Sequence, residues 1–323
     1  MAAKKATRKA ATTKADNDQR SNRMPEGIIY KALSGYYFVE DDSGRTVQCR
    51  ARGIFKKRGE SPLVGDRVLF AETENGEGTV DAIQPRSTAL VRPPVANADL
   101  AVLVFSVIRP ELNLQLLDKF LVHTEHAGLD ALIVLTKMDA TADSENADRI
   151  LRDVESARSL YTSIGYDTIV TSAKMQDGID ELRERLSRHI SVFAGQSGVG
   201  KSSLVNALVP GLQLETNEIS EKLGRGRHTT RHVELVKMAG GGYVADTPGF
   251  SQLDFAELGI DQISDCFREF RELASGCKFR GCTHLHEPGC AVMAARESGG
   301  IAESRYQHYA AFMAEWKENR RRY

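Results

Sequence analysis

The chain has 323 residues, of which 41% are hydrophobic and 27% are charged, and its net charge is −1. This composition is ordinary for a folded globular protein, and the length accommodates two or three domains. No apolar run approaches the roughly 18 residues of a membrane span, and the N-terminus lacks the apolar core of a secretory signal. We therefore expect a cytoplasmic protein that does not enter a membrane.

Residues 1–23 form a basic, polar segment without apolar periodicity. They carry seven lysines and arginines against only Asp16 and Asp18, so we predict a disordered basic tail. The C-terminus is also basic, with Lys317 and Arg320–Arg322. Both ends are suited to lie along a phosphate backbone, although solvated chain ends have the same composition.

Residues 24–94 contain five short β-like runs separated by turn residues, which predicts a small barrel, most simply an OB-fold. The predicted strands are Gly27–Ala32, Tyr36–Glu40, Arg45–Cys49, Arg67–Phe70 and Gly78–Ile83. A basic loop is expected after the third strand, with Arg50, Arg52 and Lys56–Arg58. Such a loop on a barrel favours an RNA-binding module, and a barrel with a merely solvated loop is the alternative.

Residues 95–257, after Pro93-Pro94, alternate between buried strands and amphipathic helices. This alternation predicts an α/β domain with an open, mostly parallel sheet wrapped by helices. The predicted strands are Leu100–Val107, Asp130–Leu135, Asp167–Val170, Ile190–Ala194, His232–Met238 and Gly242–Ala245. The predicted helices are Leu112–Ala127, Ala147–Ile164, Gly178–Arg188 and Lys201–Leu208.

A phosphate-binding loop lies between the fourth predicted strand and the helix that follows it. The segment fits the pattern G-x-x-x-x-G-K-[ST], in which glycines let backbone N–H groups surround phosphates. Lys201 is expected to contact the β- and γ-phosphates, and the Ser202 hydroxyl to ligate Mg²⁺. The candidate nucleotide-binding residues here are Gly195, Gln196, Ser197, Gly198, Val199, Gly200, Lys201, Ser202 and Ser203.

Two later segments are candidates for the γ-phosphate side of the same site. Asp246 opens the segment Asp246-Thr247-Pro248-Gly249, and we expect it to hold Mg²⁺ while the Gly249 N–H senses the γ-phosphate. Thr229, with Thr230 as the alternative, is expected to close over Mg²⁺ from a switch loop. Lys201, Thr229 and Gly249 therefore belong to the candidate catalytic group.

The residue that positions the attacking water is the open point of this site. Phe250 stands where many GTPases have a glutamine, and phenylalanine cannot position water. We therefore expect slow hydrolysis by the chain alone. His228, beside Thr229, is a candidate water orienter or base, and a solvent-exposed loop histidine is the alternative.

Two short motifs after buried strands favour guanine as the base. In Thr136-Lys137-Met138-Asp139, the Asp139 carboxylate can accept guanine N1–H and the exocyclic amino group, and the Lys137 stem can cover the base. The first position is usually asparagine, so Thr136 offers only a hydroxyl to support the loops. In Ser172-Ala173-Lys174, the Ala173 N–H is expected to meet guanine O6.

The guanine motif precedes the phosphate loop, whereas ordinary GTPases have the reverse order, so the α/β domain reads as a circularly permuted GTPase. A P-loop ATPase or kinase is one alternative, in which Asp139 would have no role. A nucleotide-independent RNA-binding protein with a decayed core is another, and the intact Lys201, Ser202 and Asp246 argue against it.

Residues 258–323 are predicted to be a helical lobe with a metal site. Its predicted helices are Asp261–Leu273, Ala291–Glu297 and Glu303–Arg320. Cys277, Cys282, His284 and Cys290 supply three thiols and one imidazole within 14 residues, which matches a closed, structural Zn²⁺ site. His286 is a rival fourth ligand.

With the inverted motif order, Gly195–Ser202, His228-Thr229-Thr230, Asp246–Gly249 and the cysteine spacing, the chain resembles the small-subunit-dependent, circularly permuted GTPases of the RsgA/YjeQ family. The resemblance implies an OB-fold, a permuted GTPase domain and a zinc-binding lobe. It implies GTP hydrolysis stimulated by the 30S subunit, contact with 16S rRNA in late subunit maturation, and a catalytic contribution from His228.

We expect the protein to be a monomer.

The alternative function is a nucleotide switch acting on a non-ribosomal RNA or protein partner. Because the lobe directly follows the γ-phosphate sensor, we also hypothesise that GTP and GDP set different lobe orientations.

Overall fold

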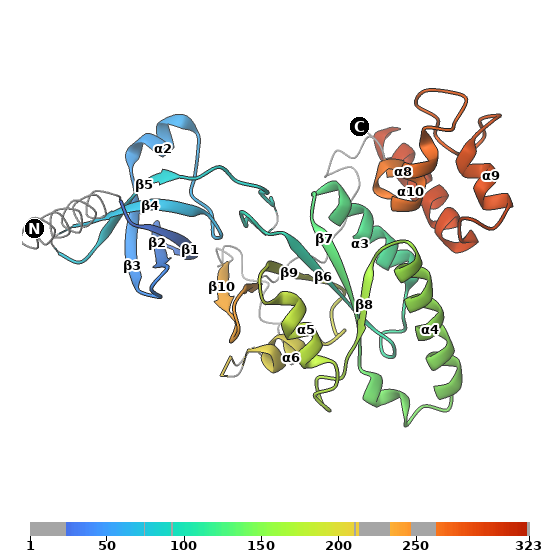
Figure 1. Ribbon diagram of the computed structural model, residues 1–323, viewed down its shortest axis with the longest axis horizontal. Coiled ribbons are helices and arrows are strands. Elements are labelled where there is room, and N and C mark those ends of the chain that lie inside the picture. Colours follow the sequence, from blue (N-terminus) through green and yellow to red (C-terminus); the bar gives the residue numbers. More distant parts are fainter. Residues whose placement is uncertain are drawn as a thin grey trace, which may run out of the picture. The chain divides into compact units, whose positions relative to one another are not determined.

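The structure is a computed structural model that describes residues 24–73, 75–91, 93–209, 211–212, 233–246 and 263–321 (Figure 1). The chain divides into two compact units after Arg86. The predicted basic tail, residues 1–23, lies outside the described residues. Among the helices that the structure describes, none is both long and apolar enough to cross a membrane.

The first unit is a closed five-stranded barrel. Its strands are β1 (Glu26–Leu33), β2 (Tyr36–Asp41), β3 (Thr46–Ala51), β4 (Arg67–Glu72) and β5 (Gly78–Ile83). β1 pairs with β2 and β4, β2 with β3, and β5 with β3 and β4, so the circuit closes without a free edge. Only β3 and β5 run parallel. The OB-like barrel predicted from the five β-like runs is confirmed.

Alternate side chains fill the barrel, as the two-residue period of a strand requires. Val47 and Cys49 of β3 and Val68 and Phe70 of β4 are all buried. Gly78 begins β5 where it crosses β3, and a Cβ there would lie 2.6 Å from Cys49 Sγ. Only glycine permits that close approach.

The expected basic loop of the barrel is largely a helix. Residues 53–58 form α2 (Gly53–Arg58), which buries Phe55 and ends at Gly59 in the left-handed conformation. The prediction of a loop was wrong because Phe55 anchors one face to the barrel. Lys56, Lys57 and Arg58 occupy the last turn, where the helix dipole favours cations.

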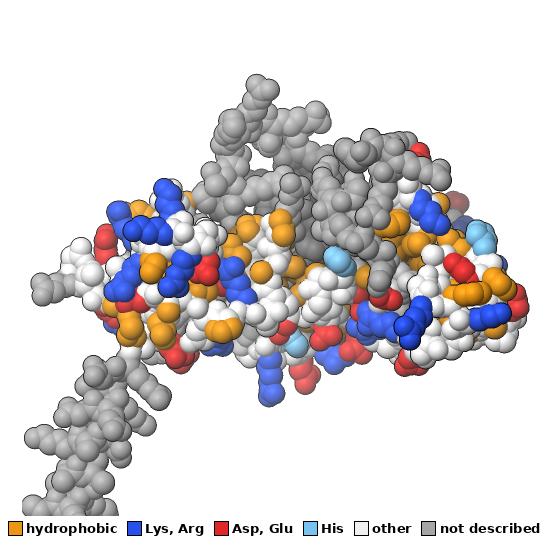
Figure 2. Space-filling model, turned by 90° about the horizontal axis from the view of Figure 1, so that it is seen from above, with side chains coloured by type: hydrophobic (Ala, Val, Ile, Leu, Met, Phe, Trp, Pro, Cys, Tyr) orange, Lys and Arg blue, Asp and Glu red, His pale blue; other side chains and the backbone are white. Residues whose placement is uncertain are grey.

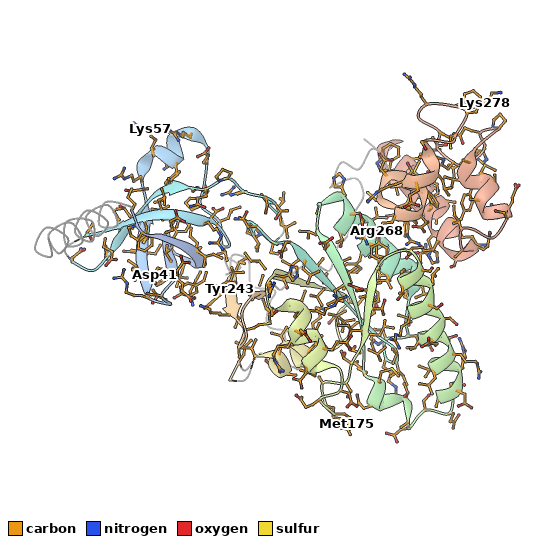
Figure 3. All side chains as sticks on the ribbon, in the orientation of Figure 1. Asp41, Lys57, Met175, Tyr243, Arg268 and Lys278 are labelled. Carbon is orange, nitrogen blue, oxygen red and sulfur yellow. The ribbon has the colours of Figure 1, made fainter. Side chains whose placement is uncertain are left out.

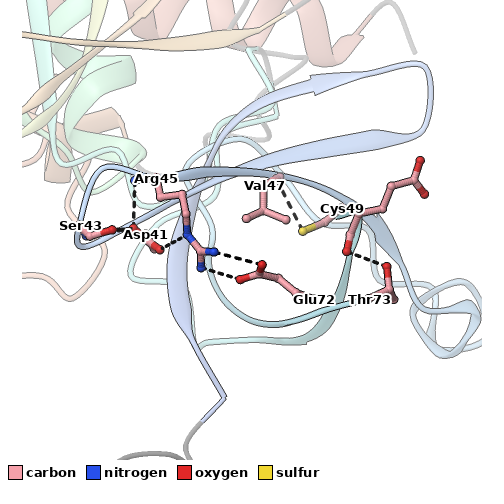
Figure 4. Close-up of polar contacts among 8 residues, drawn as sticks. Asp41, Ser43, Arg45, Val47, Cys49, Glu72 and Thr73 are labelled. Carbon is pink, nitrogen blue, oxygen red and sulfur yellow. Dashed lines mark hydrogen bonds and ion pairs between the residues drawn. The ribbon is translucent and has the colours of Figure 1, made fainter. Parts of the chain in front are cut away.

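Arg45 links the β2–β3 hairpin to β4 at the barrel surface (Figure 4). Its Nε lies 3.3 Å from Asp41 Oδ2, and its terminal nitrogens contact both carboxylate oxygens of Glu72 at 2.5 and 3.1 Å. Ser43 also donates to Asp41, and these hydrogen bonds lower the pKa of Asp41 to about 2. The hairpin is thereby held in one register.

The second unit contains a six-stranded sheet in the order β10-β11-β9-β6-β7-β8. All neighbours are parallel except β10 and β11. The strands are β6 (Leu100–Ser106), β7 (Asp130–Thr136), β8 (Asp167–Val170), β9 (Ile190–Ala194), β10 (Glu234–Lys237) and β11 (Tyr243–Asp246). The predicted open, mostly parallel sheet is confirmed.

Helices cover both faces of this sheet. They are α3 (Leu114–His126), α4 (Ala147–Ser163), α5 (Ile179–Leu186) and α6 (Lys201–Leu208), with the 3₁₀ turn η1 (Met138–Thr141) after β7. On β6, Val102 and Val104 belong to the same core as the buried residues of α5 and α6. On the other face, the Phe105 ring meets the Phe120 ring of α3 edge-on at 5.7 Å. Burial on both faces explains the near-continuous apolar runs of these strands.

The rest of the second unit is a helical lobe with an aromatic core. It contains η2 (Ile263–Cys266), α8 (Arg268–Ala274), α9 (Ala291–Glu297) and α10 (Glu303–Arg321). Phe267 is fully buried and packs against Phe270, Tyr309 and Phe312. The prediction of one helix over 261–273 was wrong, because the backbone of Phe267 is extended and separates η2 from α8.

A buried ion-pair cluster holds the lobe on α3. Arg305 of α10 is 1% exposed, and its guanidinium lies 2.5 Å from the fully buried Asp118 of α3 and 2.7 Å from Glu269 of α8. The hydroxyl of Tyr161 from α4 donates to Asp118 at 2.6 Å. The Asp118 carboxylate therefore joins three helices.

Glu125, near the C-terminal end of α3, makes a similar link to the lobe. Glu125 lies 2.6 Å from Arg268 Nε and also pairs with Arg271, both from α8 (Figure 3). Tyr166 donates to Glu125 at 3.0 Å, and the Arg268 guanidinium lies 4.1 Å from the Tyr166 ring centroid. We call the residues Asp118, Glu125, Tyr161, Arg268 and Arg305 the docking cluster.

Candidate nucleotide and metal sites

Four loops meet at the carboxyl edge of the parallel strands. They follow β6, β7, β8 and β9, which lie side by side in the sheet in the order β9-β6-β7-β8. In open α/β sheets this edge is where ligands bind. The candidate phosphate and guanine residues therefore lie together despite their separation in the sequence.

The phosphate loop runs from β9 into the first turn of α6. Gly195 has φ +146°, and a Cβ there would lie 2.2 Å from the Val104 carbonyl oxygen. Gly198 and Gly200 also have positive φ. These glycines let the loop turn back over the sheet edge, and α6 begins at Lys201 directly behind it. The geometry is that of an anion-binding turn at a helix N-terminus.

Lys201 bridges the two sides of this loop. Its Nζ donates to the carbonyl oxygens of Gly195 and Gln196 at 2.7 and 2.6 Å. Burial lowers the pKa of Lys201 to about 8. A phosphate placed beside the ammonium would favour its charged form.

Thr136, at the end of β7, connects the guanine motif to the phosphate loop. It is buried, and its hydroxyl donates to the Val199 carbonyl oxygen at 2.6 Å. The unusual first residue of the motif thus supports the loops through its hydroxyl, in the way its chemistry suggested.

Lys137 makes a second connection, and it involves a loop that the sequence analysis missed. The residue adopts φ +65°, and its Nζ donates to the Gly198 and Arg109 carbonyl oxygens at 2.6 and 2.5 Å. Arg109 belongs to the loop after β6. This loop could have been predicted from the sheet, because β6 lies between two strands of the site and runs parallel to them. The loop after β6 must therefore lie at the same edge of the sheet.

Asp139 is held by the third loop. The Ser172 hydroxyl donates to Asp139 Oδ1 at 2.7 Å, and the Met138 N–H points to the Thr171 carbonyl oxygen at 3.4 Å. The structure therefore brings Thr136, Lys137, Met138 and Asp139 together with Ser172, and Ala173 and Lys174 follow directly in the same loop. The Ser172 hydroxyl thus engages one carboxylate oxygen of Asp139 and restricts the movement of the group.

The γ-phosphate side is described only in part. Asp246 is the last residue of β11, one position beyond the Ala245–Val192 pair, so its backbone lies beside the strand that enters the phosphate loop. Its side chain, His228, Thr229, Thr230 and Gly249 lie outside the described residues.

Replacing Thr136 with valine is expected to weaken guanine nucleotide binding about tenfold. The change leaves the buried Val199 carbonyl without its hydroxyl donor, a loss of about 1–3 kcal/mol. Titration with a fluorescent GDP analogue measures the effect. Thr136→Ser keeps the hydroxyl and should bind as the parent does. Equal affinity of the valine and parent proteins would show that this bond does not support the nucleotide site.

The lobe contains a compact group of metal-ligand side chains. The donor atoms of Cys277, Cys282, His284 and Cys290 all lie within 4.8 Å of one another. Cys277 Sγ is 3.9 Å from Cys290 Sγ, and His284 Nδ1 is 3.6 and 3.3 Å from these two sulfurs. Tetrahedral Zn²⁺ with bonds near 2.3 Å to sulfur and 2.0 Å to nitrogen separates its ligands by roughly 3.5–3.8 Å. These four side chains, which we call the four-ligand group, fit such an ion.

The loop between the second and fourth of these ligands is held in place by its neighbours. His284 is 3% exposed and lies in the group, whereas His286 is exposed and does not. Tyr306 of α10 donates to the His284 carbonyl oxygen at 2.8 Å. Glu287 accepts backbone N–H groups of Thr283 and Leu285 at 2.9 and 3.0 Å. Such support orients metal ligands before the ion arrives.

Residues 83–256 match the family model described as RsgA GTPase, and residues 26–80 match the RsgA N-terminal domain. Proteins from Geobacillus kaustophilus and Bacillus subtilis are 52% and 50% identical to this chain over 300 and 303 residues, which is 93% of this chain and all of each relative. Both are named small ribosomal subunit biogenesis GTPase RsgA. The chain belongs to the RsgA family of GTPases.

Solved structures agree with this assignment. The structure titled as YloQ, a circularly permuted GTPase, has a TM-score of 0.79 and 42% identity, covering 92% of this chain and 96% of that one. YjeQ from Thermotoga maritima has a TM-score of 0.77 and 38% identity, covering 90% and 98%. This RsgA-family GTPase is therefore a circularly permuted enzyme that acts on GTP.

Proposed function

We propose that this RsgA-family GTPase binds the 30S ribosomal subunit through 16S rRNA and hydrolyses GTP to GDP and phosphate during late maturation of that subunit. One observation carries the proposal. Thr136 and Lys137 join the guanine and phosphate loops, and the chain matches the full length of relatives that are named for small-subunit biogenesis. A cytoplasmic monomer suits this role.

In the nucleotide site, Asp139 reads the guanine edge and the Ala173 N–H meets guanine O6. The Lys137 stem covers the base. Glycine N–H groups of the Gly195–Gly200 loop and the Lys201 ammonium bind the phosphates. The Lys201 contacts to Gly195 and Gln196 hold its ammonium at the loop that a β-phosphate would enter.

Ser202, Asp246 and Thr229 are proposed to hold Mg²⁺. The first turn of α6 and the end of β11 flank the phosphate loop, which supports the first two. When bound, Mg²⁺ neutralises charge on the β- and γ-phosphate oxygens. His228 is proposed to orient the attacking water, and the Gly249 N–H to sense the γ-phosphate. One Zn²⁺ is proposed at the four-ligand group, with a structural role.

The barrel is proposed to face the rRNA through its basic side. Lys56, Lys57 and Arg58 gather on the last turn of α2, and Figure 2 shows Lys and Arg side chains concentrated over the barrel. The Arg50 guanidinium lies 4.4 Å from the centroid of the Tyr36 ring. Cations beside an aromatic ring on a small barrel suit a single-stranded backbone with stacked bases.

The test is GTP turnover by the purified protein with and without 30S subunits. We expect strong stimulation by 30S subunits, little by 50S subunits, and loss of the stimulated turnover in Lys201→Ala. That variant removes the ammonium that the phosphate loop holds in place. Rapid GTP turnover that 30S subunits do not change would support the GTPase activity and contradict the ribosomal partner. The alternative, a nucleotide switch that acts on a non-ribosomal RNA or protein, would then be favoured.

A further inference from the structure

The loop between the first two cysteine ligands presents an aromatic ring to solvent. Phe279 is 46% exposed, and it is the only phenylalanine among the large apolar side chains that the structure describes as exposed. Lys278 and Arg280 flank it and are exposed too. Lys278 Nζ lies 5.6 Å from the Phe279 ring centroid, and Figure 3 shows Lys278 on a loop that projects from the lobe.

The loop is fixed in this exposed arrangement. Cys277 and Cys282 tether both its ends to the four-ligand group. The Lys278 N–H donates to the Gly289 carbonyl oxygen at 3.0 Å, and a Cβ on Gly289 would lie 3.2 Å from Lys278 Cβ. The backbone beside Phe279 is therefore held in place, which reduces the conformational freedom that the loop loses on binding.

The charge around the ring is positive. Residues 276–282 contain Lys278 and Arg280 and no aspartate or glutamate, although the whole chain has a net charge of −1. Of the two nearest acidic residues in the sequence, Glu287 is engaged with backbone N–H groups of its own turn, and Glu272 lies in α8, seven residues before Phe279. The loop thus offers an aromatic face between two cations.

We propose that Phe279 is a stacking platform for an unpaired nucleotide of RNA, with Lys278 and Arg280 contacting the adjoining phosphates. The proposal rests on the proposed 30S function and assigns the lobe its own contact there. Nucleobases stack on exposed aromatic rings, and sequence-tolerant binding combines such rings with cations. An apolar groove of a protein partner fits less well, because the neighbours of Phe279 in this loop are charged.

The first test places a reporter at the ring. The full-length, zinc-loaded protein carries Phe279→Trp, and Trp316→Phe removes the one natural tryptophan. A short unstructured RNA oligonucleotide should quench the new tryptophan saturably, and the same RNA annealed into a duplex should not. RNA binding seen by anisotropy without quenching would place the RNA elsewhere and overturn the proposal.

The second test uses 30S subunits and matched variants. Phe279→Leu keeps apolar volume but cannot stack a base, and we expect it to weaken 30S affinity at least about fivefold, while Phe279→Tyr retains the affinity. Zinc content should be unchanged in both. Parent-like affinity of the leucine variant would point to an apolar protein contact and reject stacking. If the parent protein does not bind 30S subunits, the proposed ribosomal function is wrong. The quenching test still shows whether RNA stacks on the ring at position 279.

Discussion

Replacing Arg305 with methionine is expected to lower the free energy of unfolding of the second unit by about 3–5 kcal/mol. The buried Asp118 and the part-buried Glu269 lose their guanidinium partner. Asp118 then keeps only the Tyr161 hydroxyl and the His308 ring among the contacts that the structure describes. Arg305 and Asp118 are 1% and 0% exposed, so water cannot replace the lost partner. Denaturant unfolding followed by far-UV circular dichroism measures the change.

The control for this variant is an ion pair of the same type at the surface. Arg149 lies 3.6 Å from Asp153 on α4, with both side chains more than half exposed, and Arg149→Met should cost less than about 1 kcal/mol. Adding Asp118→Asn to Arg305→Met should recover part of the loss, since one unpaired charge is then removed. Equal costs for the Arg305 and Arg149 variants would mean that the docking cluster does not hold the lobe.

Removal of Zn²⁺ is expected to unfold the lobe while the barrel stays folded. Apparent binding free energies of structural zinc sites are about 10–16 kcal/mol, and in this lobe the proposed ligands Cys277, Cys282 and Cys290 also contact the aromatic core. Near-UV circular dichroism should lose the signal of Tyr306, Tyr309 and Trp316 when a chelator is added. Metal analysis should find about one zinc per chain beforehand.

Two cysteine variants separate the metal from general packing. Cys290→Ser removes a ligand and should abolish zinc retention, with the same spectral change as chelation. Cys266→Ala alters a buried cysteine of the same lobe that lies outside the four-ligand group, and it should keep the zinc. A lobe spectrum that survives both chelation and Cys290→Ser would show that the aromatic core suffices without metal.

The elements that position the nucleotide were largely predictable from the sequence, because each depends on local pattern. β8, β9 and α6 begin and end at the predicted residues, since apolar runs and the glycines of the phosphate loop mark them. The four-ligand group was also predictable from spacing. The choice between His284 and His286 was not, because it depends on the fold of the loop.

The features that were missed depend on long-range contacts. Arg305 and Asp118 are far apart in the sequence, and each resembles an ordinary surface charge on an amphipathic helix until the helices pack. The Arg109 carbonyl reaches Lys137 only because β6 and β7 are neighbours in the sheet. Phe267 breaks a helical pattern because its ring fills the centre of the lobe. The hypothesis that nucleotide state reorients the lobe stays a prediction, and such a movement would have to separate the docking cluster.

The docking cluster also determines which part of the α/β domain a force on the lobe reaches first, namely α3. α3 carries Asp118 and Glu125 and is the direct connection between β6 and β7, whose ends hold Arg109, Thr136 and Lys137. A force applied to the lobe by a large bound particle would therefore act through α3 on the loops after β6 and β7. We expect such a force to change the rate at which the nucleotide dissociates.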